Sequence, residues 1–495
     1  MRPLRSFLLL LIFLACFTGL HYIIPANQLF PSIYEFVPSA LLSKTHDRTQ
    51  NQITATIRIA SPDTTAETVS IPAIPEILSS IPLKSFIDSL IYSRGQVRII
   101  YYGDSQIEGD RITSYMRSTL RKRRGGTGPG LLLPLMPVMY TKSVWVRSSS
   151  NWKKYNYLSY KTGEISHRNL GPFMAICRYL PEGETASEPE KASVRIKPSN
   201  VADSASAVYD ILRIFYGNTE GVVNIVVKGD GIELFTDTLK RGRGYNEIKC
   251  PLKGTKDIVI EFKGRVSPDI YGISIESENG VVVDNMPQRG SAGLEFTMVD
   301  RDNLRESYEK LSPDLIILHY GLNIVKNVRD NYSYYQKGLI RQISLLREIS
   351  PLTPVLIIGV TDMASNEGDS IKSYSNIPAI LDAQKRATLK ADVTFWNSYL
   401  AMGGESSIIR WAEKKPPLAQ KDFIHFTYTG ADTLSELLVS SLFAVPAIDT
   451  VQHAISDIPY VRVPDAPRVI IYKSEKAVIK RSFIISVISS VLNYD

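Results

Sequence analysis

Three nearly continuous apolar runs, each followed by a helical pattern, constrain the fold of this chain more than any other feature. They are RIIYYG at 98–103, PDLIILHYG at 313–321 and TPVLIIGVT at 353–361. Strands that are buried on both faces have this character, and they belong to parallel sheets in which helices join successive strands. The alternation therefore predicts an α/β domain whose parallel sheet is covered by helices on both faces.

A different pattern interrupts this alternation at 141–280. Short runs such as SVRIKPS and DIVIEFKG alternate apolar and polar residues, and turn residues separate them. This spacing predicts an all-β sandwich of the jelly-roll type, which we call the β module. The α/β domain would then comprise 95–140 and 281–450. A tether and lead-in segment at 26–94 precedes it, and a C-terminal tail at 451–495 follows it.

Residues 1–25 have the character of an export segment. Arg2 and Arg5 precede a short apolar run, as in a cleaved signal peptide or an uncleaved N-terminal membrane anchor. Either alternative predicts an exported protein of the periplasm or cell envelope, with membrane contact through the N-terminus in the second case. Export would place Cys177 and Cys250 in an oxidising compartment, where they could pair, or they could be buried free thiols.

The charge and motif content argue against other large classes of function. The net charge is +7, but the basic residues are scattered except at 121–124. The sequence contains no zinc pattern, P-loop or RNA-binding signature, so we expect no nucleic-acid partner, no metal and no cofactor. The glycine run at 125–130 follows a helical segment rather than a strand, which favours a loop over a dinucleotide site.

Residues that could support serine hydrolysis lie at the ends of the predicted strands. Such chemistry needs a hydroxyl nucleophile, a base and donors for an oxyanion. Ser105 follows the first strand, although a serine in a turn can equally cap a helix. Of the six histidines, His319 and His425 lie in the predicted α/β domain, and only His425 has an acid, Asp422, three residues before it.

Four short blocks resemble those of the SGNH (GDSL-like) hydrolase family. They are Gly-Asp-Ser at 103–105, VVVDNMPQRGSAG with its glycine at Gly290, HYGLN ending in Asn323, and DFIH at 422–425. The blocks occur in the family's order, and three of them follow predicted strands. In the first block Gln106 stands where Leu is usual. Two further departures are that Ile324 replaces the Asp that often follows the Asn of the third block, and that the β module separates the first two blocks.

The resemblance implies a flavodoxin-like three-layer α/β/α fold and a set of roles. Ser105 would be the nucleophile, His425 the base and Asp422 the residue that orients it. The backbone N–H groups of Ser105 and Gly290 and the side chain of Asn323 would form the oxyanion hole. The blocks assign no substrate-binding residue.

An exported SGNH domain with an inserted sandwich resembles the bacterial peptidoglycan O-acetylesterases and related cell-wall carbohydrate esterases, whose inserted module resembles a carbohydrate-binding one. This implies a carboxylic ester hydrolase that removes acyl groups, acetyl above all, from an envelope polysaccharide such as peptidoglycan. Two alternatives stay open, namely an O-acetyltransferase with the same triad and a non-catalytic glycan-binding protein. We expect the β module to hold glycan without building the active site, so that its excision leaves small-ester activity intact.

Overall fold

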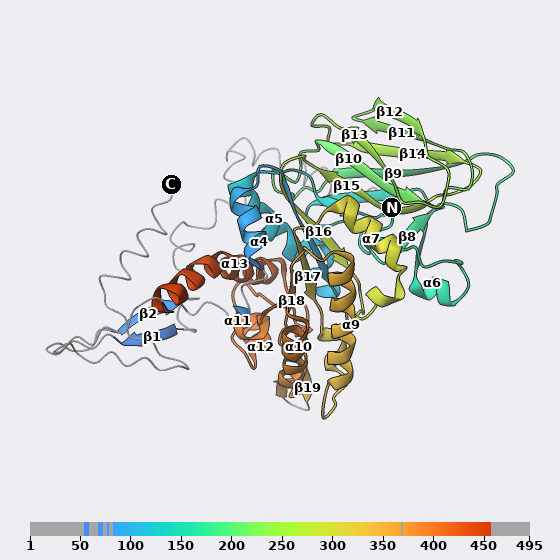
Figure 1. Ribbon diagram of the computed structural model, residues 1–495. Helices are drawn as coiled ribbons and strands as arrows, with labels where there is room; N and C mark the ends of the chain where they lie inside the picture. The colour runs from blue at the N-terminus through green and yellow to red at the C-terminus, as the bar shows by residue number, and fades with distance from the viewer. Residues whose placement is uncertain (1–53, 59–67, 73–76, 79–82, 368–369, 457–495) are drawn as a thin grey trace, which may run out of the picture. The chain divides into compact units, whose positions relative to one another are not determined.

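The computed structural model describes residues 54–58, 68–72, 77–78, 83–367 and 370–456 (Figure 1). The predicted export segment lies outside this part of the chain, as does most of the predicted tail. Strands β1 (Thr54–Arg58) and β2 (Thr68–Pro72) form an antiparallel pair in a unit of their own. The remaining elements belong to one compact unit, Ile74–Val461. Among the described helices, none has the length and apolar character needed to cross a bilayer.

A parallel sheet forms the centre of the larger unit. It consists of β4 (Gln96–Gly103), β16 (Gly280–Pro287), β17 (Leu315–His319), β18 (Val355–Ile358) and β21 (Thr394–Trp396). The spatial order is β16-β4-β17-β18-β21, which in chain order reads 2-1-3-4-5 and is the flavodoxin-like arrangement. The short strand β3 (Ile77–Leu78) adds to β21 in the antiparallel direction.

Helices cover both faces of this sheet, as the alternation predicted (Figure 1). One face carries α4 (Lys84–Tyr92), α5 (Arg111–Arg124), α11 (Ser398–Met402), α12 (Ser407–Glu413) and α13 (Tyr428–Ser456). The other carries α7 (Arg301–Leu311), α9 (Ser333–Ile349) and α10 (Ile377–Ala391). In α5, Ile112, Met116 and Leu120 recur at helical spacing and are buried against the sheet. The predicted three-layer α/β/α fold is confirmed.

Short connecting elements complete the α/β part. The 3-10 segments η2 (Ser105–Asp110) and η3 (Phe296–Met298) and the one-turn helix α8 (Leu322–Val325) follow strands or precede helices. A small hairpin, β19 (Ala364–Glu367) with β20 (Ser370–Ser373), lies between β18 and α10.

The β module consists of two antiparallel sheets that pack into a sandwich. One sheet has the order β13-β10-β15-β8-β7 and the other β12-β11-β14-β9-β6. Their strands are β6 (Val144–Ser148), β7 (Lys153–Asn156), β8 (Ala175–Arg178), β9 (Glu190–Pro198), β10 (Ile211–Gly217), β11 (Val223–Gly229), β12 (Ile232–Thr238), β13 (Asn246–Pro251), β14 (Ile258–Gly264) and β15 (Asp269–Glu276). Strand β5 (Gly130–Leu132) also pairs with β15, so this sheet recruits residues before 141. One short helix that the sequence did not predict, α6 (Tyr157–Lys161), follows β7.

The glycine run at 125–130 is a packing loop. Gly126 and Gly128 have positive φ angles of +111° and +77°, which favour glycine. A Cβ atom at Gly126 would lie 2.6 Å from the Val281 backbone, and one at Gly128 would lie 2.2 Å from the Ile275 carbonyl oxygen. Glycine is therefore needed where α5 turns back against β15 and β16.

A buried ion-pair network joins the module to the parallel sheet. Arg98 on β4 is fully buried, and its guanidinium contacts Asp284 on β16 at 2.6 Å and Glu276 on β15. Arg213 on β10 contacts Glu276 at 3.0 Å. Burial alone would raise the pKa of Glu276, but the charges of Arg98 and Arg213 outweigh it and lower the pKa to about 2. Within this buried network, the Arg98–Glu276 pair is the one that links the parallel sheet to the module.

The two parts also share an apolar core. One contiguous cluster runs from Val194 and Ile214 in the sandwich to Tyr102 on β4 and Tyr335 on α9. The hydroxyl of Tyr102 donates to the carbonyl of Pro172 at 2.8 Å. These contacts argue against the expectation that the β module folds as a separable unit.

The two described cysteines are free and buried. Cys177 lies on β8 and Cys250 on β13, and strands β10 and β15 separate them in the sheet. Neighbouring strands lie about 4.8 Å apart, so the Cα atoms are far beyond the roughly 7 Å that a disulfide can bridge. Of the two alternatives for Cys177 and Cys250, the structure therefore has the two buried free thiols.

Candidate active site

The strand ends that carry the sequence blocks are level with one another. In the register of the parallel sheet, Gly103 on β4 is paired with Pro287 on β16 and with His319 on β17. The residues that follow these three positions leave the same edge of the sheet. Strand β4 has β16 on one side and β17 on the other, so the chain connections run to opposite sides of β4. In doubly wound sheets, ligands bind at such a switch point.

Three side chains form a continuous hydrogen-bonded chain at this edge. Ser105 Oγ lies 2.9 Å from His425 Nε2, and His425 Nδ1 lies 2.7 Å from Asp422 Oδ2. Asp422 Oδ1 also accepts the backbone N–H groups of Ile424 and His425, both at 3.0 Å. Burial would raise the pKa of Asp422, but the hydrogen bonds from His425 lower it, so the carboxylate stays ionised beside the imidazole. This arrangement permits Ser105 to pass its proton to His425.

Gln106 holds the segment that carries His425. Its amide nitrogen donates to the Ile424 carbonyl at 2.6 Å, and its amide oxygen accepts the Phe426 N–H at 3.3 Å. Arg111 adds a hydrogen bond from its guanidinium to the Ser105 carbonyl at 2.7 Å. The sequence signal for Gln106 was its place in the first block, where Leu is usual, but its partners 318 and 320 residues away could not be predicted.

Asn323 and Asp104 lie on the other side of Ser105. The amide nitrogen of Asn323 donates to the Ser291 carbonyl at 2.8 Å and contacts Asp104 Oδ2 at 3.3 Å. Asp104 is buried and caps the turn by accepting the Gln106 N–H at 3.0 Å. Burial raises the pKa of Asp104 to about 7, although this hydrogen bond and the charge of Arg111 oppose the rise.

Gly290 lies in an exposed loop after β16. Its φ angle is +80°, which favours glycine, and no atom lies within 4 Å of the position a Cβ would take. The neighbouring Arg289 pairs with Glu108 of η2 at 2.5 Å, which ties the loop to the segment that follows Ser105. The structure thus brings the loops of all the predicted site residues to one edge of the sheet.

Other candidate residues have structural partners. His319 is buried against Tyr101, whose hydroxyl lies 3.1 Å from Nδ1, and burial lowers the pKa of His319 to about 4. His167, a histidine of the β module, lies 3.2 Å from Asp269. Trp152 packs edge-on against Tyr179 and Phe262 in the sandwich core. Within the described ranges, no group of three or more His, Cys, Asp or Glu side chains is arranged to hold a metal ion.

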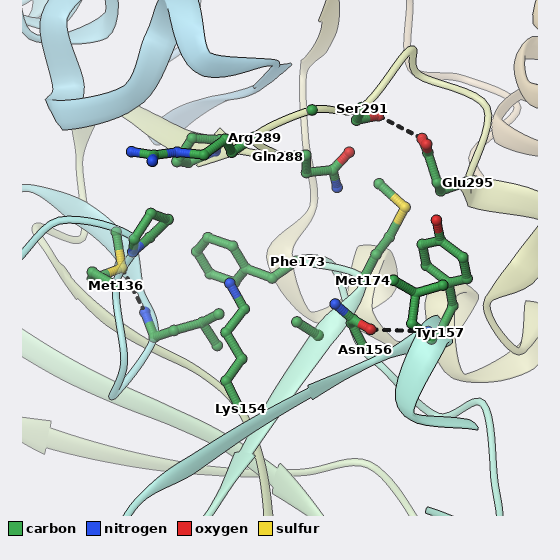
Figure 2. Close-up of a pocket in the computed structure, with 16 residues that line it drawn as sticks. Met136, Lys154, Asn156, Tyr157, Phe173, Met174, Gln288, Arg289, Ser291 and Glu295 are labelled. Carbon is green, nitrogen blue, oxygen red and sulfur yellow. Dashed lines mark hydrogen bonds between the residues drawn. The ribbon is translucent and has the colours of Figure 1, made fainter. Parts of the chain in front are cut away.

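A pocket of about 580 Å³ adjoins the Gly290 loop (Figure 2). One wall is the loop itself, and the rest comes from the β module and the segment after β5. The lining residues are Leu133, Met136, Pro137, Lys154, Asn156, Tyr157, Leu158, Phe173, Met174, Ala175, Pro287, Gln288, Arg289, Gly290, Ser291 and Glu295. The volume is in the range of small-ligand sites. Sequence reasoning assigned no residue of this pocket to substrate binding, because its walls come from segments far apart in the chain.

Replacing Asn323 by Ala is expected to lower kcat for p-nitrophenyl acetate by roughly 10²–10³-fold, with little change in KM. The contact of its amide with Asp104 is long, at 3.3 Å, so this N–H can turn to a developing oxyanion. Asn323→Asp, which keeps the shape but removes both N–H donors, should show a comparable loss. A folded Asn323→Ala protein whose defect lies only in KM would exclude this role.

Strand order, helical layers and the β insertion together define a flavodoxin-like α/β/α fold interrupted by a β sandwich. No protein-family model matches the chain, and no curated protein matches it either. Among solved structures, that of a peptidoglycan O-acetylesterase superposes with a TM-score of 0.57 at 20% identity, over 75% of this chain and 96% of that chain. This match shows the shared fold, including the fold class that the sequence blocks predicted.

Two further solved structures are similar at lower scores. An acetylxylan esterase from Geobacillus stearothermophilus has a TM-score of 0.25 at 17% identity, over 33% of this chain and 73% of that chain. A GDSL-like lipase from Bacteroides thetaiotaomicron has a TM-score of 0.24 at 18% identity, over 33% and 75%.

Proposed function

We propose that this protein is a serine esterase that removes acetyl groups from a cell-envelope polysaccharide such as peptidoglycan. The observation that carries the proposal is the hydrogen-bonded chain from Ser105 through His425 to Asp422 at the switch point of the sheet. A hydroxyl, an imidazole and a carboxylate in this order are the groups that acyl transfer through a serine requires.

The proposed reaction has two stages, formation and hydrolysis of an acyl-enzyme. Ser105 Oγ attacks the ester carbonyl as His425 Nε2 takes its proton, and the proposed donors to the resulting oxyanion are the backbone N–H groups of Ser105 and Gly290 and the Asn323 amide. When the tetrahedral intermediate collapses, His425 returns the proton to the sugar oxygen, and the acyl group stays on Ser105. Water then attacks the acyl-enzyme with His425 again as the base, releasing acetate.

Two observations favour an envelope polysaccharide as substrate and a location outside the cytoplasm. A solved structure with the same fold is a peptidoglycan O-acetylesterase, and its match extends over most of both chains. The basic and apolar character of residues 1–25 is that of an export segment, which would bring the protein to the periplasm or cell envelope. We therefore propose an exported enzyme whose partner is an acylated envelope glycan.

The test is acetate release from purified protein mixed with O-acetylated peptidoglycan, with and without soluble acceptor sugars. We expect free acetate in both mixtures and none with Ser105→Ala. Acetylated acceptor sugar in place of free acetate would identify an O-acetyltransferase with the same triad. Binding of glycan without release or transfer of acetyl groups would instead leave a glycan-binding protein.

A further inference from the structure

The pocket beside the Gly290 loop has an unequal distribution of charge. Lys154 of β7 reaches into one end of it, and Glu295 lies at the other end (Figure 2). Glu295 already has partners, because its Oε2 accepts from Ser291 Oγ at 2.5 Å and from the Leu294 N–H at 2.8 Å. The charge of Arg289 is compensated by its ion pair with Glu108 at 2.5 Å. Of these three charged side chains, Lys154 therefore remains to attract a ligand.

Lys154 has no ion-pair partner within 4 Å in the part of the chain that the structure describes. Lys154 is an exposed residue, but the surrounding protein partly desolvates its ammonium group and lowers the pKa of Lys154. An ammonium group that is partly desolvated and unpaired is unfavourable, and an anionic ligand would relieve that cost. Its neighbour Lys153 contrasts with it, since Lys153 pairs with Glu164 at 2.6 Å.

Two amide groups in the pocket supply hydrogen-bond donors. Gln288 accepts from the Tyr320 hydroxyl at 2.7 Å, whereas its buried amide nitrogen has no partner among the described residues. Figure 2 shows this nitrogen directed into the pocket. Asn156 uses its oxygen to cap α6 at 2.9 Å, which leaves its amide nitrogen facing the same space. A buried donor without a partner is unfavourable, so the Gln288 amide nitrogen favours a ligand that offers an acceptor, and the half-buried Asn156 amide can donate to the same ligand.

We propose that this pocket binds the carboxylate of an acidic sugar residue in the acylated glycan. Lys154 is its counter-ion, and the amides of Gln288 and Asn156 donate hydrogen bonds to the same sugar. The apolar side chains of Phe173 and Met174 pack against its ring carbons and acetyl methyl groups. Because Gly290 belongs to both the pocket and the candidate oxyanion hole, a sugar held here places a nearby ester at Ser105. This assignment rests on the proposed function and gives the substrate class as an acidic glycan.

Binding can be measured without turnover by placing Ser105→Ala in the full chain. Calorimetric titrations would use two acidic probes, trigalacturonic acid and the disaccharide of N-acetylglucosamine and N-acetylmuramic acid. Each acid is compared with its own methyl ester, which keeps the sugar and removes the charge. With Lys154 present, at least one acid should bind about tenfold or more tightly than its ester, as expected for a charged hydrogen bond. Lys154→Met should abolish that preference, and Lys154→Arg should retain it.

Lys153→Met is the matched control. It removes the same charge from the same strand, but successive strand residues point to opposite faces, so the preference for the acid should survive. The inference is wrong if neither acid is preferred over its ester, or if Lys153→Met and Lys154→Met have equal effects. A protein that shows the Lys154-dependent preference but releases no acetate would retain this site and refute the proposed esterase activity.

Discussion

Ser105→Ala is expected to hydrolyse p-nitrophenyl acetate at least several thousandfold more slowly than the wild-type protein. The Oγ atom that lies 2.9 Å from His425 Nε2 is lost, and no acyl-enzyme can form. What remains is stabilisation of the oxyanion by the surrounding N–H donors and binding of the substrate, which in serine hydrolases gives only a small residual rate. The measurement is steady-state hydrolysis at neutral pH.

Ser187→Ala provides the control for this prediction, because Ser187 is an exposed loop residue of the β module. It should have the wild-type rate. Circular dichroism and thermal unfolding should be unchanged in both variants, since replacing one half-buried hydroxyl removes little stabilising contact. A folded Ser105→Ala protein with an undiminished rate would exclude Ser105 as the nucleophile.

Arg98→Met is expected to lower the free energy of unfolding by about 3–5 kcal/mol. Arg98 is fully buried, and its removal leaves the carboxylates of Glu276 and Asp284 without their main counter-charge. Because these residues lie on β4, β15 and β16, the loss should destabilise the module and the parallel sheet together. Urea unfolding followed by tryptophan fluorescence should show one transition in both proteins, displaced to lower urea in the variant.

Arg195→Met is the comparison for this effect. Arg195 pairs with Asp257 at 2.5 Å on the surface of the module, where its side chain is 46% exposed. A surface pair of this kind contributes at most about 1 kcal/mol. Equal effects of the two substitutions, or two separate unfolding transitions, would contradict the tight attachment and restore the expectation that the module can be excised.

The α/β fold and the placing of the site residues could be predicted because both depend on local patterns. Continuous apolar runs such as 313–321 identify buried parallel strands, and the carboxyl ends of parallel strands meet at one edge. The order of the four blocks then brings Ser105, Asn323 and His425 together. The short strands of the sandwich were predictable for the same reason, since turn residues separate each from the next.

Features that depend on contacts between distant segments could not be predicted. The partners of Arg98 lie 178 and 186 residues away in the chain. Nothing in the local sequence identifies Glu276 or Asp284 as the counter-charges of Arg98. Likewise Lys154 and Gln288 belong to one pocket only because the module packs beside the loop after β16. The expectation of an independent module followed from its pattern of short alternating strands, which carries no information on what its outer surface contacts.

The position of β4 in the sheet has a consequence for the order in which the protein can fold. Its two neighbours, β16 and β17, both follow the β module in the chain, so both edges of the strand that leads to Ser105 lack partners until the module has been made. At a synthesis rate of about 5–20 residues per second, the stretch from Gly103 to Gly280 takes roughly 10–35 s. During that interval an apolar strand with two unpaired edges can associate with other chains. We therefore expect the yield of folded protein to depend strongly on chaperones that shield β4 while the sandwich forms.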